Sequence, residues 1–387
     1  MFLSVENIKN LTSEKYISNE DFKNNFKIYP QKNDILMTRI GDIGTTNIVK
    51  DNSPKAYYVS LALIRPINID PEFLNISISS DFVQWGLRNR SLLTAIPMKI
   101  NKDQIGEVDI KFPINSKEQQ NIGSIFKNID NLITLHQRKY DKLVNVKQSL
   151  LEKMFPKNYS NIPEIRFKGF TDVWEQRKLD KLLEQYTEVT TINNQYPALT
   201  SSRKGIFFQT EYFAGNQIAS SNNVGYNIVP RNYFTYRHMS DDEIFHFNIN
   251  DICDFGIVST LYPVFTTKKE LDSKYLQYQL NYGKEFAKFS SLQKQGGSRT
   301  YMYFVKLKEL VLTMPKVEEQ TKISSFLSNI DNLITLHQRK LYLFSNYLKL
   351  LTLSLFYLYR YFLILELYAS KFFALSTYLH VLIYVQH

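Results

Sequence analysis

Apolar residues recur every three or four positions in the middle of the chain, and this spacing predicts a helix from about residue 117 to about 155. Ser116 and Gln119 form a capping-box pattern at its start, and Pro156 follows its end. At 1.5 Å per residue the helix is roughly 55–60 Å long, too long for one small domain to bury. The spacing therefore predicts a coiled-coil seam. The seam comprises Ile122, Ile125, Ile129, Leu132, His136, Tyr140, Leu143, Lys147, Leu150 and Met154.

The same helix pattern occurs a second time. The sequence NIDNLITLHQRK stands at residues 128–139 and again, without a mismatch, at 329–340. A period near 200 residues is too long for a solenoid and indicates a duplicated domain with its connector. We expect the two helices to pack on each other through their equivalent residues, which include Ile129, Leu132, Ile330 and Leu333.

His136 and His337 occupy the same position of the two seams. Histidines at such a place would suit a metal site or a pH switch. No carboxylate or second histidine lies four residues further along either helix, so we interpret both as packing histidines.

Short apolar runs separated by turn residues precede each helix and predict strands. In the first half these runs are DILMTRIGDIGTTNIV and AYYVSLALIRP, and in the second half NYFTYRH, FHFNI and GIVSTLYPVFTT. Residues 35–39 align with 233–237, so the strand-bearing parts are duplicated too, although they have diverged. Divergent segments beside nearly identical helices suggest two different recognition tasks.

The composition favours a polyanionic partner. The 387 residues carry a formal net charge of +10 with an ordinary 44% of hydrophobic residues, so a folded protein with a basic surface is expected. The single cysteine, Cys253, excludes an internal disulfide and a cysteine-rich zinc site. The start MFLSVENIKN has no signal-peptide pattern, and we expect a cytoplasmic protein.

Loops of both halves carry side chains of the types that contact DNA. Arginine reads guanine and asparagine or glutamine reads adenine, whereas serine, threonine and lysine commonly hold phosphates. An ordinary solvated position is the alternative for any one of them. The candidates in the first half are Thr38, Arg39, Arg88, Asn89 and Arg90, and those in the second half are Ser201, Ser202, Arg203, Lys204, Arg237, Lys294, Gln295 and Arg299.

Catalytic signatures are missing from the sequence. It contains no phosphate-binding GxxxxGK[ST] loop, HExxH, GxSxG or Cys/His cluster. The stretch Gly41–Gly44 lacks the third glycine of a dinucleotide-binding loop, and Asp272-Ser273-Lys274 is a nuclease-like tripeptide that is common by chance. We predict that the chain catalyses nothing and binds no cofactor or metal itself.

The segments PEIRFKGFTDVWEQRKLDKLLEQ, DILMTRIGDIGTTNIV and EQQNIGSIFKNIDNLITLHQRK with its twin resemble the specificity subunit of type I restriction-modification systems, over about residues 3–340. The resemblance implies an α+β fold with two tandem target recognition domains, each followed by a long helix. The two helices would pair as an antiparallel coiled coil with pseudo-two-fold symmetry. It also implies a non-catalytic reader of a bipartite double-stranded DNA target that positions two methyltransferase subunits and the restriction subunits. S-adenosylmethionine, ATP and Mg would then belong to those partners.

Both ends of the chain depart from the family pattern. The first half has no counterpart to FTDVWEQRKL, so the first recognition domain is expected to be N-terminally incomplete. The Leu/Tyr/Phe-rich tail carries too many charges for a clear membrane helix, and a shifted reading frame or a rearranged gene explains it better. The expected divisions are a first recognition domain, a repeated helix, a second recognition domain, a second repeated helix and the tail, at residues 1–115, 116–156, 163–315, 316–345 and 346–387.

Two other interpretations stay open. The chain is an inactive or rearranged remnant of such a subunit in one, and a helical scaffold or membrane-associated protein in the other. Salt-dependent binding to duplex DNA would favour the specificity subunit, whereas partition into detergent or lipid without DNA binding would favour the scaffold.

Overall fold

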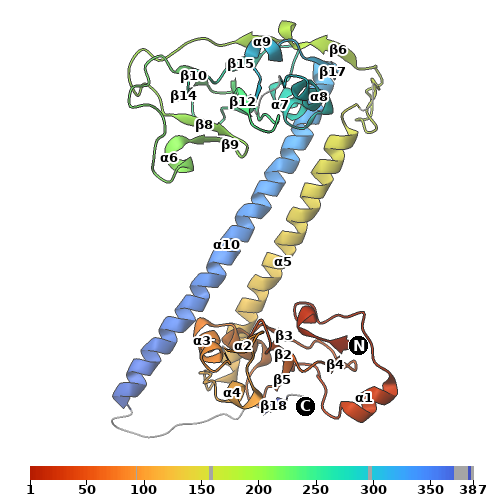
Figure 1. The fold of residues 1–387 in the computed structure, drawn as a ribbon, viewed down its shortest axis with the longest axis vertical. Helices are drawn as coiled ribbons and strands as arrows, with labels where there is room; N and C mark the ends of the chain where they lie inside the picture. Colours follow the sequence, from red (N-terminus) through yellow and green to blue (C-terminus); the bar gives the residue numbers. More distant parts are fainter. Residues whose placement is uncertain (93, 157–159, 295–298, 370–381, 385–387) are drawn as a thin grey trace. The chain divides into compact units, whose positions relative to one another are not determined.

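The computed structural model describes residues 1–92, 94–156, 160–294, 299–369 and 382–384 (Figure 1). Backbone contacts divide the chain into unit 1, Met1–Lys139 with His337–His387, and unit 2, Tyr140–Leu336. Each unit contains one part of each long helix, α5 (Ser116–Lys153) and α10 (Val317–Ala369). The bounds of α5 confirm the helix that the periodicity predicts, whereas α10 continues well past its expected end near residue 345.

Unit 1 combines strands and helices. Its four-stranded antiparallel sheet has the order β18-β5-β2-β3, and β1 pairs with β4 in parallel. The strands are β1 (Phe2–Leu3), β2 (Ile35–Thr38), β3 (Thr46–Ile48), β4 (Ala56–Tyr57), β5 (Leu61–Arg65) and β18 (Leu382–Tyr384). The helices besides α5 and α10 are the 3₁₀ turn Val5–Asn7, α1 (Asn19–Asn25), α2 (Pro71–Ile78), α3 (Asp81–Asn89) and α4 (Lys102–Gly106).

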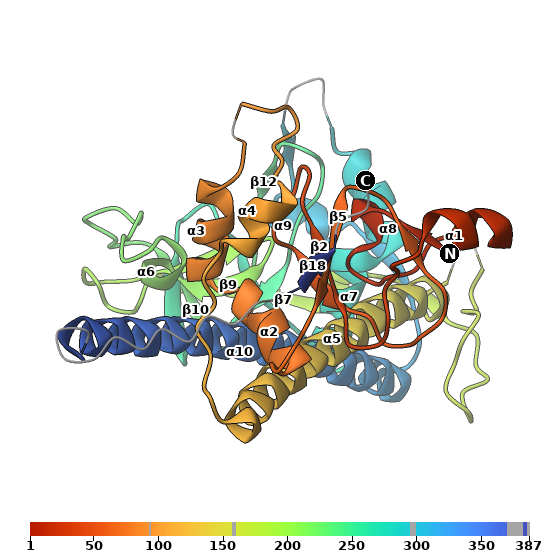
Figure 2. The same cartoon turned by 90° about the horizontal axis from the view of Figure 1, so that it is seen from below.

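The central strands of unit 1 are buried on both faces. Ile35 and Met37 of β2 point into a core that includes Phe73 and Leu74 of α2, while the intervening Leu36 points into a second core. This alternation follows from the two-residue period of a strand. Figure 2 shows α2, α3 and α4 on one side of β2 and β5, with α1 on the other. The strands match the apolar runs of the sequence.

Unit 2 has more and shorter strands. Its largest sheet is antiparallel with the order β13-β11-β15-β7, and the other strands form antiparallel pairs. The strands are β6 (Glu175–Lys178), β7 (Leu183–Gln185), β8 (Leu199–Ser202), β9 (Gly205–Phe208), β10 (Asn227–Pro230), β11 (Phe234–Thr235), β12 (Met239–Ser240), β13 (Asn248–Ile249), β14 (Phe255–Val258), β15 (Val264–Thr267), β16 (Thr300–Tyr301) and β17 (Val311–Met314). The helices are the 3₁₀ turn Leu179–Lys181, α6 (Gln209–Tyr212), α7 (Ser273–Tyr282), α8 (Lys284–Ser291) and α9 (Phe304–Leu307), besides α5 and α10.

Gln119 ties the start of α5 to the start of α2. Its side-chain oxygen accepts the N–H of Asp70 at 2.8 Å, and its amide donates to the carbonyl of Pro113 at 2.7 Å. Asp70 in turn caps α2, because its carboxylate accepts the N–H of Phe73 at 2.9 Å. The Gln119 side chain is buried, and it satisfies one backbone donor and one backbone acceptor.

Unit 2 contains the same network at equivalent positions. Gln320 accepts the N–H of Asp272 at 2.9 Å and donates to the carbonyl of Pro315 at 2.8 Å. Asp272 caps α7 by accepting the N–H of Tyr275 at 2.8 Å. The two glutamines thus have the same role at the start of each long helix. This network also gives Asp272 a structural role in place of the nuclease-like one.

The predicted capping box at the start of α5 is wrong. The side chain of Asn115, not Ser116, accepts the N–H of Lys117 at 2.9 Å. Gln119 is not available to complete a box, because its amide is engaged with Asp70 and Pro113.

Replacing Gln119 or Gln320 with alanine is expected to lower the free energy of unfolding by about 2 kcal/mol, because a buried backbone donor and acceptor lose their partner. Urea unfolding of the full chain followed by circular dichroism measures this effect. Glu118→Ala is the control, since Glu118 is the exposed neighbour of Gln119. Equal shifts for Gln119→Ala and Glu118→Ala would show that the network does not stabilise the fold.

The long helices pair in antiparallel orientation (Figure 1). His136 of α5 faces His337 of α10, with the two Nδ1 atoms 2.7 Å apart. In an antiparallel pair with this contact, residues that precede His136 on α5 face residues that follow His337 on α10, whereas Ile330 and Leu333 precede His337. The predicted packing of Ile129 and Leu132 on their equivalents in the second copy is therefore wrong. His136 and His337, in contrast, are equivalent residues that do contact each other.

The contact between His136 and His337 lies within unit 1. Their ring centroids are 5.0 Å apart, and Phe344 stacks on His136 at 5.6 Å. One Nδ1 donates and the other accepts, so the contact holds one proton between two imidazoles. The second histidine comes from the other copy of the repeat, so the spacing along one helix does not reveal it. Both remain packing residues, but they pack on each other.

The stability of the helix pair is expected to fall in mild acid. Burial lowers the pKa of His136, and the imidazole of His337 and the ammonium groups of Lys340 and Lys139 lower it further. Burial and the same two lysines lower the pKa of His337. As the pH falls below about 6.5, the histidines of the unfolded chain therefore take up protons before the folded pair does. Because the unfolded state binds more protons, the free energy of unfolding decreases as the pH falls through the folded pKa values.

The double variant His136→Leu/His337→Leu tests this pH dependence. Thermal unfolding is measured for this variant and for the natural chain between pH 5 and pH 8. The natural chain should lose more stability over that range than the variant, whose two positions no longer titrate. Parallel curves would contradict the prediction.

Candidate nucleic-acid interface

Basic side chains from three segments of unit 2 converge on the turn that follows β12. This turn consists of residues 241–243, and all three of them are acidic. Each of its carboxylates pairs with a cation that the sequence had nominated for DNA contact. The pairs are Arg203–Asp242 at 2.5 Å, Lys294–Glu243 at 2.7 Å and Arg299–Asp241 at 3.2 Å.

Arg237 lies in the same unit, shortly after β11, and is exposed. Among the residues that the structure describes, no carboxylate lies within ion-pair distance of it. Its neighbour His238 is buried against Tyr301 and Tyr303, with ring centroids 5.9 and 5.4 Å away. Burial lowers the pKa of His238. The two tyrosines are 40% and 55% exposed, so they present aromatic faces beside the basic residues.

The segment after β2 in unit 1 and the segment after β11 in unit 2 align one residue away from the alignment that the sequence predicts. The N–H of Ile100 donates to the carbonyl of Arg39 at 3.0 Å, and the N–H of Met302 donates to the carbonyl of His238 at 2.7 Å. Arg39 therefore corresponds to His238, and the expected equivalence of Arg39 with Arg237 is wrong. This shift leaves Arg237 free of the structural role that Arg39 has.

The β8–β9 hairpin carries Ser201, Ser202, Arg203 and Lys204. The buried Ser201 hydroxyl donates to the carbonyl of Thr235 at 3.1 Å. The Ser202 hydroxyl donates to the Gly205 carbonyl at 3.0 Å and accepts the Lys204 N–H at 3.1 Å. The two hydroxyls thus shape the hairpin, whereas the exposed side chains of Arg203 and Lys204 stand at its tip.

In unit 1, Thr38 is buried and Arg39 is half-buried. Thr38 is 1% exposed and its hydroxyl accepts the N–H of Thr45 at 3.0 Å. The Arg39 guanidinium donates to the carbonyls of Val59 at 2.6 Å and Ile100 at 3.1 Å, and burial lowers its pKa. Both side chains thus contact the backbone of unit 1.

The other candidates of unit 1 lie at the end of α3. Arg88 and Asn89 are exposed, and the guanidinium of Arg90 donates to the carbonyl of Gly86 at 3.3 Å. Trp85, one helical turn before Arg88 and Asn89, is 63% exposed and shares their face. Trp85 is not among the candidates from the sequence, which shows the spacing of an aromatic residue but not its exposure. Gln295 lies outside the described residues.

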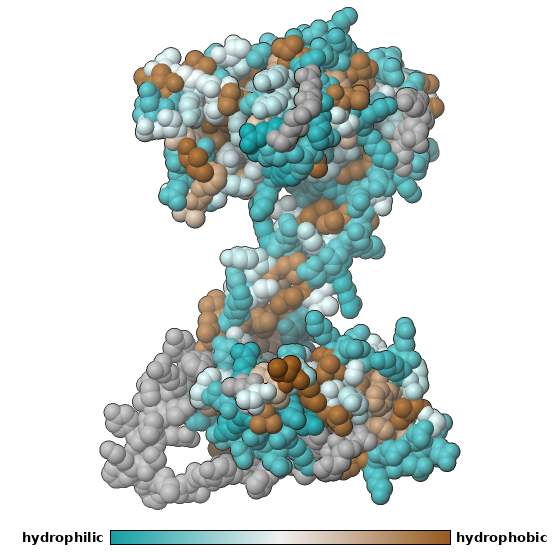
Figure 3. All heavy atoms as spheres, in the orientation of Figure 1, coloured by the Kyte–Doolittle hydropathy of each residue, from teal (hydrophilic) through white to brown (hydrophobic). Residues whose placement is uncertain are grey.

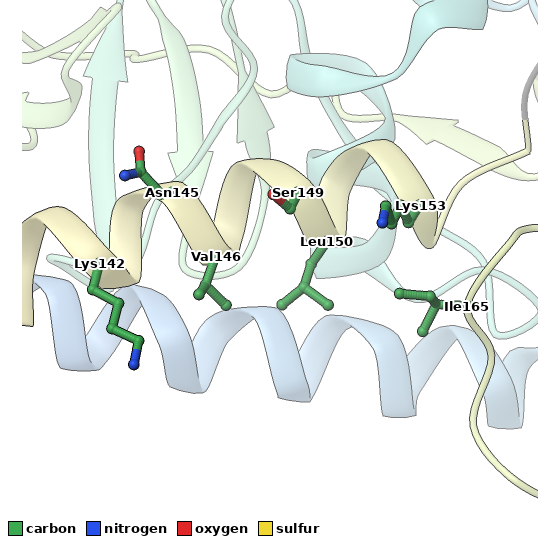
Figure 4. Close-up of a pocket in the computed structure, with 7 residues that line it drawn as sticks. All are labelled: Lys142, Asn145, Val146, Ser149, Leu150, Lys153 and Ile165. Atoms are coloured by element: carbon green, nitrogen blue, oxygen red, sulfur yellow. The ribbon is translucent and has the colours of Figure 1, made fainter.

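A recess of about 540 Å³ in unit 2 holds no catalytic set of residues. It lies along α5 and ends at Ile165, as Figure 4 shows. Lys142 and Lys153 are its charged residues, and no histidine, cysteine or carboxylate lines it. In the part of the chain that the structure describes, no three histidine, cysteine, aspartate or glutamate residues are grouped to hold a metal ion.

Over the described ranges no helix, including α10, has a stretch long and apolar enough to cross a bilayer. Burial raises the pKa of the Cys253 thiol, which is half-buried beside Asn250.

Comparison with models of protein families gives a match over both halves. The type I restriction modification DNA specificity domain matches residues 2–145 and 171–342, which together are most of the chain. The chain belongs to this family. Members recognise specific DNA sequences in type I restriction-modification systems and are non-catalytic, so this chain is a DNA-recognition protein and not an enzyme.

Three solved structures are similar at low identity. The HsdS subunit from Thermoanaerobacter tengcongensis is 15% identical with a TM-score of 0.41, covering 91% of this chain and 88% of that chain. The type I restriction-modification S subunit from M. genitalium is 14% identical with a TM-score of 0.49, covering 84% and 83%. A structure from a study of complex assembly and conformational transition of the type I R-M system is 14% identical with a TM-score of 0.40, covering 91% and 89%. The family assignment rests on the domain match and not on these structures.

Proposed function

We propose that the chain reads a bipartite DNA target, with one half-site for each unit. The convergence of Arg203, Lys294 and Arg299 on one turn, near the exposed Arg237, supports this proposal most strongly. Arginines and lysines from separate loops that gather on one surface form the charge pattern that phosphates and base edges require. We assign to unit 2 the half-site that is recognised with the greater base specificity.

The face of α3 in unit 1 would contact the other half-site. It presents the Trp85 ring beside the side chains of Arg88 and Asn89. An arginine and an asparagine on one helical face match guanine and adenine in the major groove, where a helix fits. Thr38 and Arg39 are not part of this proposal, because both serve the fold.

The long helices would dock two methyltransferase subunits, and the restriction subunits would join that complex. Figure 3 shows apolar side chains among charged ones on the long helices. In unit 1 the exposed apolar residues of α10 are Tyr342, Leu343, Tyr347, Leu350 and Leu353. S-adenosylmethionine, ATP and Mg would be bound by those partner subunits, and this chain would contribute recognition alone.

Methylome sequencing at base resolution tests the proposed function. Cells with and without the gene are compared, and a methylated motif with two specific parts and a spacer should disappear when the gene is removed. The purified chain with its methyltransferase should then bind a duplex carrying that motif better than a scrambled one, at two salt concentrations. An unchanged methylome would favour an inactive remnant and would reject the proposal.

A further inference from the structure

The acidic turn 241–243 of unit 2, which follows β12, is built to keep its position. The Ser240 hydroxyl donates to the Asp242 carboxylate at 2.8 Å, and the N–H of Ile244 donates to the same carboxylate at 3.3 Å. Glu243 has a φ of +66°, and its carbonyl accepts the hydroxyl of the buried Ser290 at 2.6 Å. The protein thus presents three carboxylates at a fixed place among the cations that the proposed function assigns to DNA.

Stability does not account for these three ion pairs. The paired side chains are between 30% and 64% exposed. Exposed pairs of this kind contribute about 0–1 kcal/mol each to folding. The charge of the turn persists at neutral pH, since the hydrogen bonds from Arg203 and Ser240 lower the pKa of Asp242 to about 2.

The pairs have a direct consequence for DNA binding. A phosphate that approaches Arg203, Lys294 or Arg299 must displace a carboxylate, and it then lies near that negative charge. The sequence-independent part of DNA affinity comes from such phosphate contacts and from the counterions they release. Base edges are different, because carboxylates accept hydrogen bonds from the amino group of cytosine.

We propose that the acidic turn determines the specificity of the second recognition domain by suppressing binding to non-target DNA. Asp241, Asp242 and Glu243 hold the three cations away from phosphates until a target sequence offers base-edge contacts. This inference rests on the proposed function, since it requires that unit 2 binds DNA.

The test compares the natural full-length chain in its methyltransferase complex with Asp241→Asn/Asp242→Asn/Glu243→Gln. These changes keep a hydrogen-bond acceptor at each position. Binding is measured by fluorescence anisotropy on a duplex with the methylome motif and on a scrambled duplex of equal length, over a series of salt concentrations. Each cation released to bind a phosphate steepens the salt dependence of non-target binding by about 0.9 units, so three cations add up to about 2.7 units.

A matched control has the same change in net charge at other ion pairs of unit 2. It is Asp172→Asn/Asp180→Asn/Asp254→Asn, which removes carboxylates paired with Lys316, Lys308 and Arg231. The acidic-turn variant is expected to bind the scrambled duplex at least roughly 10-fold more tightly than the control does at low salt, with a smaller gain on the target. The ratio of target to non-target affinity should therefore fall.

The outcomes distinguish a failure of the proposed function from a failure of the proposed role of the acidic turn. If the natural chain does not prefer the target duplex, the proposed function fails. If it does prefer the target and the acidic-turn variant keeps the ratio and salt slope of the control, the role of the turn is refuted. A loss of target affinity without a gain on scrambled DNA also overturns it, because the carboxylates would then orient the cations for readout. Should the triple variant not fold, Asp241→Asn alone releases Arg299, and its salt slope should steepen by about 0.9 units.

Discussion

Replacing Glu319 with alanine is expected to lower the free energy of unfolding of unit 2 by about 3–5 kcal/mol. The Glu319 side chain is 2% exposed and that of Arg166 is 12% exposed. The guanidinium of Arg166 donates to the two carboxylate oxygens at 2.9 and 2.6 Å, and the indole N–H of Trp174 donates to one of them at 3.2 Å. The carboxylate raises the pKa of Arg166, so its removal leaves a permanent charge nearly buried and without its partner.

The chain contains a convenient reporter for this experiment. It has two tryptophans, Trp85 in unit 1 and the buried Trp174 in unit 2. In a Trp85→Phe background, fluorescence during urea unfolding follows unit 2 through Trp174. Glu319→Gln should lose less stability than Glu319→Ala, because one acceptor remains, and the exposed neighbour Glu318→Ala should change little. A shift for Glu319→Ala no larger than that for Glu318→Ala would mean that the buried pair does not stabilise the unit.

Replacing Arg237 with alanine is expected to weaken binding to the target duplex by about 1–3 kcal/mol, a loss of roughly 5- to 150-fold. The guanidinium is exposed, and no described carboxylate holds it, so it can reach DNA without first breaking an ion pair. If it reads a base, one position of the half-site becomes tolerant of other bases and the salt dependence changes little. If it holds a phosphate, all sequences weaken alike and the salt dependence flattens by about one unit.

The measurement uses a panel of single-base variants of the methylome motif at two salt concentrations. Arg299→Ala should have a smaller effect, because DNA must compete with Asp241 for that side chain. Lys316→Ala is the control, since Lys316 is exposed, paired with Asp172 and not part of the cluster at the acidic turn. Unchanged affinity and unchanged base preference in Arg237→Ala would remove Arg237 from the proposed interface.

The sequence by itself determined the features that depend on neighbours in the chain. The exact repeat at 128–139 and 329–340 established the duplication, and the spacing of apolar residues gave the extent of α5 to within about two residues. Alternating apolar runs located strands such as β2 and β5. Periodicity of this kind reports which face of an element is buried, and it needs no knowledge of what covers that face.

Tertiary structure decided which residues meet. Gln119 has a cap-like spacing in the sequence, yet its amide bonds to Asp70, 49 residues away. Glu118 and Glu319 are equivalent in the repeat, but only Glu319 is buried with Arg166 and Trp174, whereas Glu118 is exposed. Residue type and local spacing are the same in both cases, so no local pattern distinguishes a buried ion pair from a solvated carboxylate.

In the candidate interface, too, the sequence identified the residue types and the tertiary structure decided their partners. The sequence nominated Arg39, Arg203 and Arg299 as candidates for DNA contact, and all three are arginines near predicted turns. The fold directs Arg39 to backbone carbonyls inside unit 1 and brings Arg203 and Arg299 to one acidic turn. An arginine side chain is long and satisfies its donors with whatever acceptors the packed chain brings within reach. Those acceptors come from distant parts of the sequence, and so the partner of each arginine was decided by tertiary packing alone.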